Sequence, residues 1–279
     1  MPRLVALFAP LFALVLLLAS RPAGAHEFWL QPDRYQLDAG GTVSLSLFVG
    51  EKFRGELTGI GAPALVRAEH YTAQAKHDLS PMLGRVLAGA LPLRLQGPGT
   101  HLVAMDTNPS TIELPAGKFN DYLAQEGLDA VIEARATAGR SASPGRERYR
   151  RNIKTLVVAG GVSDAAFSRR TGQRLEIVAL TDPFALPAAG PGTMAFQVFF
   201  DDLPLRGALV KLWHRGGPTL LTLQGRTDTE GRFEATLPLP GEWMASVVHM
   251  IVARGAPDAD WDSYWGNLTF ETGGLSARR

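Results

Sequence analysis

The sequence contains no cysteine among its 279 residues. This absence excludes disulfide bonds, a lipid anchor on cysteine, thiolate zinc sites and thiol catalysis. The formal net charge is only +1, so charge gives no reason to expect a nucleic acid or an anionic membrane surface as a partner. A chain without disulfides depends on a hydrophobic core, and a sequence with 46% hydrophobic residues can build one.

Motifs of common hydrolases and nucleotide-binding proteins are also missing. The sequence has no G-x-S-x-G elbow for a nucleophilic serine and no G-x-x-x-x-G-K-[ST] loop for phosphates. After the first 25 residues no apolar run approaches the roughly 20 residues that span a bilayer. We therefore expect a mature chain that is not an enzyme and has no membrane span.

The one long apolar run lies at the start of the chain. Arg3 provides a positive charge, and residues 4–19 are almost entirely apolar. Residues 23–25, Ala-Gly-Ala, then show the small-x-small pattern that signal peptidase cleaves. We interpret residues 1–25 as a signal peptide, which together with the missing cysteines indicates export to a bacterial periplasm.

Cleavage after Ala25 makes His26 the first residue of the mature protein. A terminal histidine offers a free α-amine, with a pKa of about 7.7–8.0, and an imidazole, and the two together can chelate a transition metal ion. The alternative is that cleavage happens to leave a solvent-facing histidine there. The known copper-and-nickel motif with histidine at the third mature position is absent, because Phe28 occupies that position.

Residues 26–113 show the pattern of short strands. The segment 42–49 alternates polar and apolar residues after the turn-forming Gly40-Gly41, and the segment 91–95 repeats this period of two. A further strand is expected at 100–105, after the turn at 97–99. This pattern predicts an N-terminal β-sandwich domain of the immunoglobulin-like kind.

Residues 114–154 have a different character and are predicted to form a helical insertion. Apolar residues fall at helical spacing before and after Gly127, which indicates two short helices. The basic segment from Arg146 to Lys154 follows a loop. Either it is the solvated face of a helix or it is a basic surface for a partner or an anion.

Residues 155–271 return to strand patterns, and residues 272–279 form a tail. In order, a G-A-x-V strand at 207–210, a T-D-x-x-G-R-F hairpin at 227–233 and P-G-x-W at 240–243 resemble a prealbumin-like or carboxypeptidase-regulatory-like sandwich. In the following strand His249 lies on a mainly apolar face. It is either a satisfied histidine at the edge of the core or a second imidazole for a metal held at His26.

Several ordered motifs together resemble a large periplasmic family, a DUF4198-like domain of unknown function with an N-terminal HEFWL-type motif. The motifs are A-H-E-F-W-L-x-P at 25–32, V-G-E-x-F-x-G-E at 49–56, L-P-A-x-K-F-x-x-Y-L-x-x-E-G-L at 114–128, G-R-E-R-Y-x-R at 145–151, T-D-P at 181–183, V-H-M at 248–250 and D-W-x-S-Y-W-x-x-L-T-F-E at 260–271. That family is often labelled as a nickel-uptake substrate-specific region. The resemblance implies an exported β-rich protein associated with nickel or cobalt acquisition.

Three hypotheses for the function follow. In the first, His26, with His249 as the next candidate ligand, binds nickel or cobalt for delivery to an uptake transporter in the inner or outer membrane. In the second, the same two histidines form a histidine-brace copper site. In the third, the chain is a metal-free structural or ligand-binding sandwich, in which His26 and His249 lie far apart. The remaining histidines are interpreted as ordinary surface or core-edge residues; they are His70, His77, His101 and His214.

Overall fold

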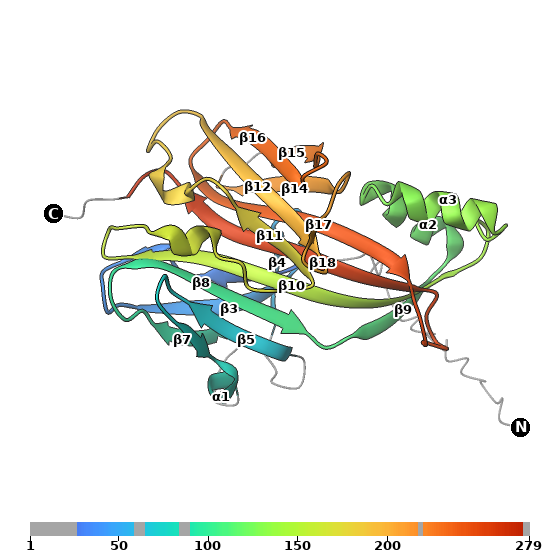
Figure 1. The fold of residues 1–279 in the computed structure, drawn as a ribbon, viewed down its shortest axis with the longest axis horizontal. Helices are drawn as coiled ribbons and strands as arrows, with labels where there is room; N and C mark the ends of the chain where they lie inside the picture. The colour runs from blue at the N-terminus through green and yellow to red at the C-terminus, as the bar shows by residue number, and fades with distance from the viewer. Residues whose placement is uncertain (1–26, 59–64, 84–89, 217–219, 276–279) are drawn as a thin grey trace, which may run out of the picture.

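The structure, a computed structural model, describes residues 27–58, 65–83, 90–216 and 220–275. Strands dominate these ranges, so the predicted mainly β fold is confirmed. They form one long sheet and two small sheets, and the small sheets pack against opposite faces of the long one (Figure 1). The signal peptide predicted at 1–25 and the candidate ligand His26 lie outside the described residues.

The first small sheet is built from the alternating sequence near the N-terminus. Its central strand β3 (Thr42–Glu51) pairs antiparallel with β1 (Glu27–Pro32), β4 (Arg54–Thr58) and β7 (Ala90–Arg94). Alternation along β3 sends Val43, Leu45 and Leu47 into the core. They meet Val103 of the long sheet there, so this sheet closes a sandwich.

The long sheet has the strand order β15-β14-β17-β18-β10-β8-β5-β6, and β2 and β9 also pair with β10. Its strands are β2 (Gln36–Leu37), β5 (Leu65–Tyr71), β6 (Lys76–Asp78), β8 (Gly99–Thr107), β9 (Ser110–Leu114), β10 (Gly145–Ala159), β14 (Leu209–Arg215), β15 (Leu221–Arg226), β17 (Gly241–Val252) and β18 (Trp261–Thr272). The sheet combines strands from both predicted sandwich regions, and β10 runs across the expected boundary at residue 154. The division into separate domains stays a prediction.

The second small sheet covers the other face of the long sheet. It consists of β12 (Gly192–Phe200) with its neighbours β11 (Leu175–Ala179), β13 (Leu203–Pro204) and β16 (Arg232–Leu237). Met194, Phe196 and Val198 alternate with more exposed residues along β12 and pack in a core with Trp243 and Phe270. Short 3₁₀ helices, η2 (Ala165–Ser168) and η3 (Pro183–Ala185), flank β11.

Two helices interrupt the strands, as their apolar spacing predicts. They are α2 (Ala116–Gln125) and α3 (Asp129–Thr137); a further short helix is α1 (Ser80–Leu83). Between α2 and α3, Gly127 adopts φ +65°, a left-handed conformation that suits glycine at a helix end. Phe119 and Leu123 of α2 pack against Trp265 of the long sheet. None of the helices in the described ranges is long and apolar enough to cross a membrane.

The prediction of a helix face for the basic segment from Arg146 to Lys154 is wrong. These residues belong to β10, which pairs in parallel with β18. The register places Arg148 opposite Asp262, and its Nε lies 2.6 Å from a carboxylate oxygen of that residue. Arg150 reaches the same carboxylate at 3.2 Å. The run of basic residues suggested a solvated helix because their acidic partners are not visible locally: they come from a strand more than 100 residues away.

Candidate functional site

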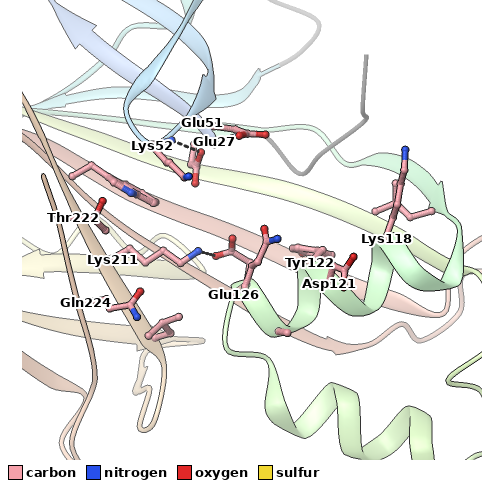
Figure 2. A pocket seen from close by; sticks show the side chains of 15 residues that line it. Glu27, Glu51, Lys52, Lys118, Asp121, Tyr122, Glu126, Lys211, Thr222 and Gln224 are labelled. Carbon is pink, nitrogen blue, oxygen red and sulfur yellow. Dashed lines mark hydrogen bonds and ion pairs between the residues drawn. The ribbon is translucent and has the colours of Figure 1, made fainter. Parts of the chain in front are cut away.

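A charged cleft of about 730 Å³ lies where the N-terminal strand meets the middle and C-terminal parts of the chain. Its walls come from β1 and the β3–β4 turn, from α2, and from β14 and β15. Figure 2 shows Glu27 and Lys52 on one wall, Glu126 and Lys211 across from them, and Gln224 on the β15 side. The cleft therefore joins residues that are far apart in the sequence.

Glu27 is a buried carboxyl on the wall of this cleft. Strand alternation puts it on the same face of β1 as Trp29, which packs with Trp213 and Met244 of the long sheet. Its carboxylate accepts a hydrogen bond of 3.2 Å from the backbone N–H of Lys52. Burial, and then the negative charge of Glu126, raise the pKa of Glu27 to about 7.

Glu126 and Lys211 form a second buried feature of the cleft. Glu126 caps the C-terminal end of α2, and its Oε2 lies 2.7 Å from the Nζ of Lys211 on β14. The side chains are only 10% and 12% exposed, respectively. Burial raises the pKa of Glu126, whereas the ammonium of Lys211 acts in the opposite direction. Lys211 also lowers the pKa of Glu27, so two buried carboxyls share the charge of one buried ammonium.

The rim of the cleft carries charges of both signs. Lys118 and Asp121 line it from α2, and Glu51 lines it from the end of β3 (Figure 2). Tyr122 also lines it, and its hydroxyl donates a hydrogen bond of 3.2 Å to Glu147. Carboxylate oxygens are thus the main ligand atoms that the described residues of this cleft offer to a cation.

His249 lies away from this cleft. It alternates along β17 with Val248 and Met250, which belong to the core beneath α2, and it faces the opposite side with Val247. Its ring packs 4.4 Å from that of Phe200, centroid to centroid. Burial lowers the pKa of His249 to about 4, so its imidazole is neutral at neutral pH.

The structure therefore does not bring His249 to the residue that follows His26. Glu27 lines the cleft together with Lys211 and Trp213 of the long sheet, whereas His249 lies on the opposite face of that sheet. His26 itself is outside the described residues, so its pairing with His249 stays a prediction. Within the ranges that the structure covers, no group of three or more histidine, aspartate or glutamate side chains is arranged to hold a metal ion.

Sequence reasoning missed a second cluster, in which three other histidines form a row. His77 on β6, His70 on β5 and His101 on β8 lie side by side across the edge of the long sheet. His70 and His77 are seven residues apart and become direct cross-strand neighbours. A tight turn at 72–75 between two alternating strands is the signal that could have predicted this pair.

Comparisons with known proteins give a family but no function. The model of a family described as "Domain of unknown function (DUF4198)" matches residues 23–251. No curated protein matches the chain.

Similar solved structures are remote. The D0-D1 domain of intimin is 13% identical, with 88% of this chain and 98% of that chain covered and a TM-score of 0.22. Trypsin-activated alpha-2-macroglobulin from Escherichia coli is 8% identical, with 89% and 16% covered and a TM-score of 0.22. At these scores the similarity supports no statement about how this chain works.

Proposed function

The chain belongs to the DUF4198 family of domains of unknown function, and from that premise we propose that it is an exported periplasmic protein that binds a divalent transition metal ion at its mature N-terminus. The metal is nickel or cobalt, with copper as the alternative. The protein holds the ion for an uptake transporter in the inner or outer membrane and performs no reaction. The observation that carries the proposal is the position of Glu27, the residue directly after His26, in the wall of a cleft with buried carboxyls.

The donor set fits such an ion. His26 would supply its α-amine and imidazole nitrogens, and Glu27 or Glu126 would supply a carboxylate oxygen. Nitrogen and oxygen donors together suit nickel, cobalt, copper and zinc, and intrinsic affinity favours copper among them. A divalent cation would also balance the two buried carboxyls, which have one buried ammonium, Lys211, close to them.

This arrangement differs from a histidine brace that uses His249. Glu27 and His249 lie on opposite faces of the long sheet, so cleft carboxylates are better placed than His249 to complete a site that starts at His26. The proposal therefore assigns no ligand role to His249. A copper brace with two histidines is a separate outcome of the same experiment.

The experiment compares protein processed in cells, with its N-terminus confirmed by mass spectrometry, with a form that carries one extra alanine before His26. The insertion moves the α-amine away from the imidazole and leaves every side chain in place. Each form is titrated with Ni²⁺, Co²⁺, Cu²⁺ and Zn²⁺. We expect a tight site in the processed form that the extended form lacks.

Two further variants locate the remaining ligands. Glu126→Gln keeps the size of the side chain and is expected to weaken binding, because it removes a cleft carboxylate. His249→Gln is the matched control and is expected to leave the affinity unchanged. Equal binding by the processed and extended forms would place any site elsewhere. No binding by either would leave the metal-free sandwich as the function class.

A further inference from the structure

Three imidazoles form a row that the proposed function does not use. His77 of β6 and His70 of β5 are register partners, with ring centroids 5.7 Å apart. His101 of β8 continues the row, with its ring centroid 5.0 Å from that of His70. His70 and His101 are 5% and 1% exposed, whereas His77 is exposed on an edge strand of three residues. The row therefore runs from solvent into the edge of the N-terminal core.

Hydrogen bonding along the row assigns the tautomers of the two buried rings. The Nε2 of His101 lies 3.4 Å from the carbonyl oxygen of Gly97, which can only accept a hydrogen bond. In neutral His101 the proton is then on Nε2 and Nδ1 carries a lone pair. The Nε2 of His70 lies 2.8 Å from that Nδ1, so it donates its proton there. The remaining nitrogen of His70, Nδ1, is left with a lone pair.

This is how proteins prepare a histidine for a metal ion. A ligating histidine almost always donates its other ring N–H to an acceptor, which fixes the tautomer and the orientation of the ring. Here His101 is that acceptor, and its own orientation is held by Gly97.

We propose that His70 and His77 form a second, solvent-open site for a borderline divalent transition metal ion, with His101 as the positioning residue. Cross-strand neighbours on one face of an antiparallel pair have Cβ atoms about 4.5–5.5 Å apart, which lets two imidazoles reach one ion. Water completes the coordination, since no third histidine, aspartate or glutamate converges on a common position within the described part of the chain. The site is independent of the cleft beside Glu27.

The test uses the form with one extra alanine before His26, which removes the N-terminal chelate. Zn²⁺ is the probe, and the histidine side chains are labelled with ¹⁵N for NMR. We expect one equivalent of Zn²⁺ to shift the Nδ1 signal of His70 and one nitrogen signal of His77. The His77→Gln variant should abolish these shifts without affecting the fold, because His77 is exposed.

A matched control and a positioning variant complete the test. His214→Gln removes a histidine that bonds to the carbonyl of Pro240 at 2.9 Å and should leave Zn²⁺ binding unchanged. His101→Gln should weaken binding by about 10–100-fold at unchanged stoichiometry. Zn²⁺ shifts that persist in His77→Gln, or that are confined to other histidines, would overturn the proposal. Loss of the N-terminal site alone would leave it intact.

Discussion

A buried ion pair joins the long sheet to the second small sheet. The Nζ of Lys154 on β10 lies 3.0 Å from the Oε1 of Glu176 on β11, and the side chains are 2% and 0% exposed. Glu176 accepts further hydrogen bonds from Arg170 at 2.8 Å and from the backbone N–H of Thr171 at 2.6 Å. The carboxylate therefore keeps donors when the lysine is replaced, whereas the lysine depends on this carboxylate.

We predict unequal costs for breaking the pair from its two sides. Glu176→Gln leaves a buried ammonium without its counter-charge and should lower the free energy of unfolding by about 3–5 kcal/mol. Lys154→Met leaves Glu176 with its other donors and should cost about 1–3 kcal/mol. The double variant, with both Glu176→Gln and Lys154→Met, should recover much of the stability that Glu176→Gln alone loses, because its two neutral side chains leave no buried charge without a partner.

The pH dependence gives the prediction a second readout. Burial by itself raises the pKa of Glu176, but Lys154 and the hydrogen bonds from Arg170 and Thr171 lower it to about 2. A carboxyl whose pKa falls on folding stabilises the protein above its unfolded pKa of about 4.5, and this contribution is lost as the pH falls toward 2. Burial lowers the pKa of Lys154. The Glu176→Gln variant should therefore lose less unfolding free energy at high pH, because Lys154 gives up its proton there and no uncompensated charge stays buried.

Urea unfolding of the wild type, both single variants and the double variant measures these differences at about pH 7 and about pH 9.5. We expect Glu176→Gln to be the less stable single variant at neutral pH, and the difference in unfolding free energy between the two single variants to narrow at the higher pH. Equal losses in the two single variants, or a gap independent of pH, would refute it.

Two further variants probe packing and charge elsewhere. Gly145→Ala places a Cβ against the ring of Phe119 in the interface between α2 and β10. We therefore expect the free energy of unfolding, measured by thermal unfolding, to fall by about 1–3 kcal/mol. Phe119→Leu in the same chain should recover part of that loss. Asp262→Asn should cost about 1–3 kcal/mol at pH 7, because the side chain is 8% exposed and accepts two hydrogen bonds from Arg148. Burial by itself raises the pKa of Asp262, but the hydrogen bonds and charge of Arg148 outweigh it, so the pKa in the folded protein lies below its usual value. The wild type should therefore lose its extra free energy of unfolding over Asp262→Asn as the pH falls below about 3.8. Urea unfolding of the variant should lack this pH-dependent loss.

Local patterns in the sequence were enough to predict most elements. The alternation in 42–49 predicts β3, and the helical spacing on either side of Gly127 predicts α2 and α3. These elements follow from period and turn residues, because each buries one face regardless of its partner. The mainly β class follows for the same reason.

Features that depend on partners distant in the sequence could not be predicted in this way. Arg146 and Arg148 lie in a strand because acidic residues from the far end of the chain neutralise them. Asp260, directly before β18, pairs with Arg146, and Asp262 of β18 pairs with Arg148 across the parallel strands. The histidine row needs the register of three strands. The cleft needs Glu27 and Lys211, which come together only where the first small sheet packs against the long sheet. No local periodicity encodes such pairings.

Anomalous X-ray diffraction at the metal absorption edge, recorded on crystals of the processed protein loaded with Ni²⁺, tests the central claim most directly. We expect an anomalous peak in the cleft beside Glu27 and Glu126, at about 2.0–2.2 Å from nitrogen and oxygen ligand atoms. A cleft without a peak in metal-loaded crystals, or a peak at His249 in its place, would contradict the account.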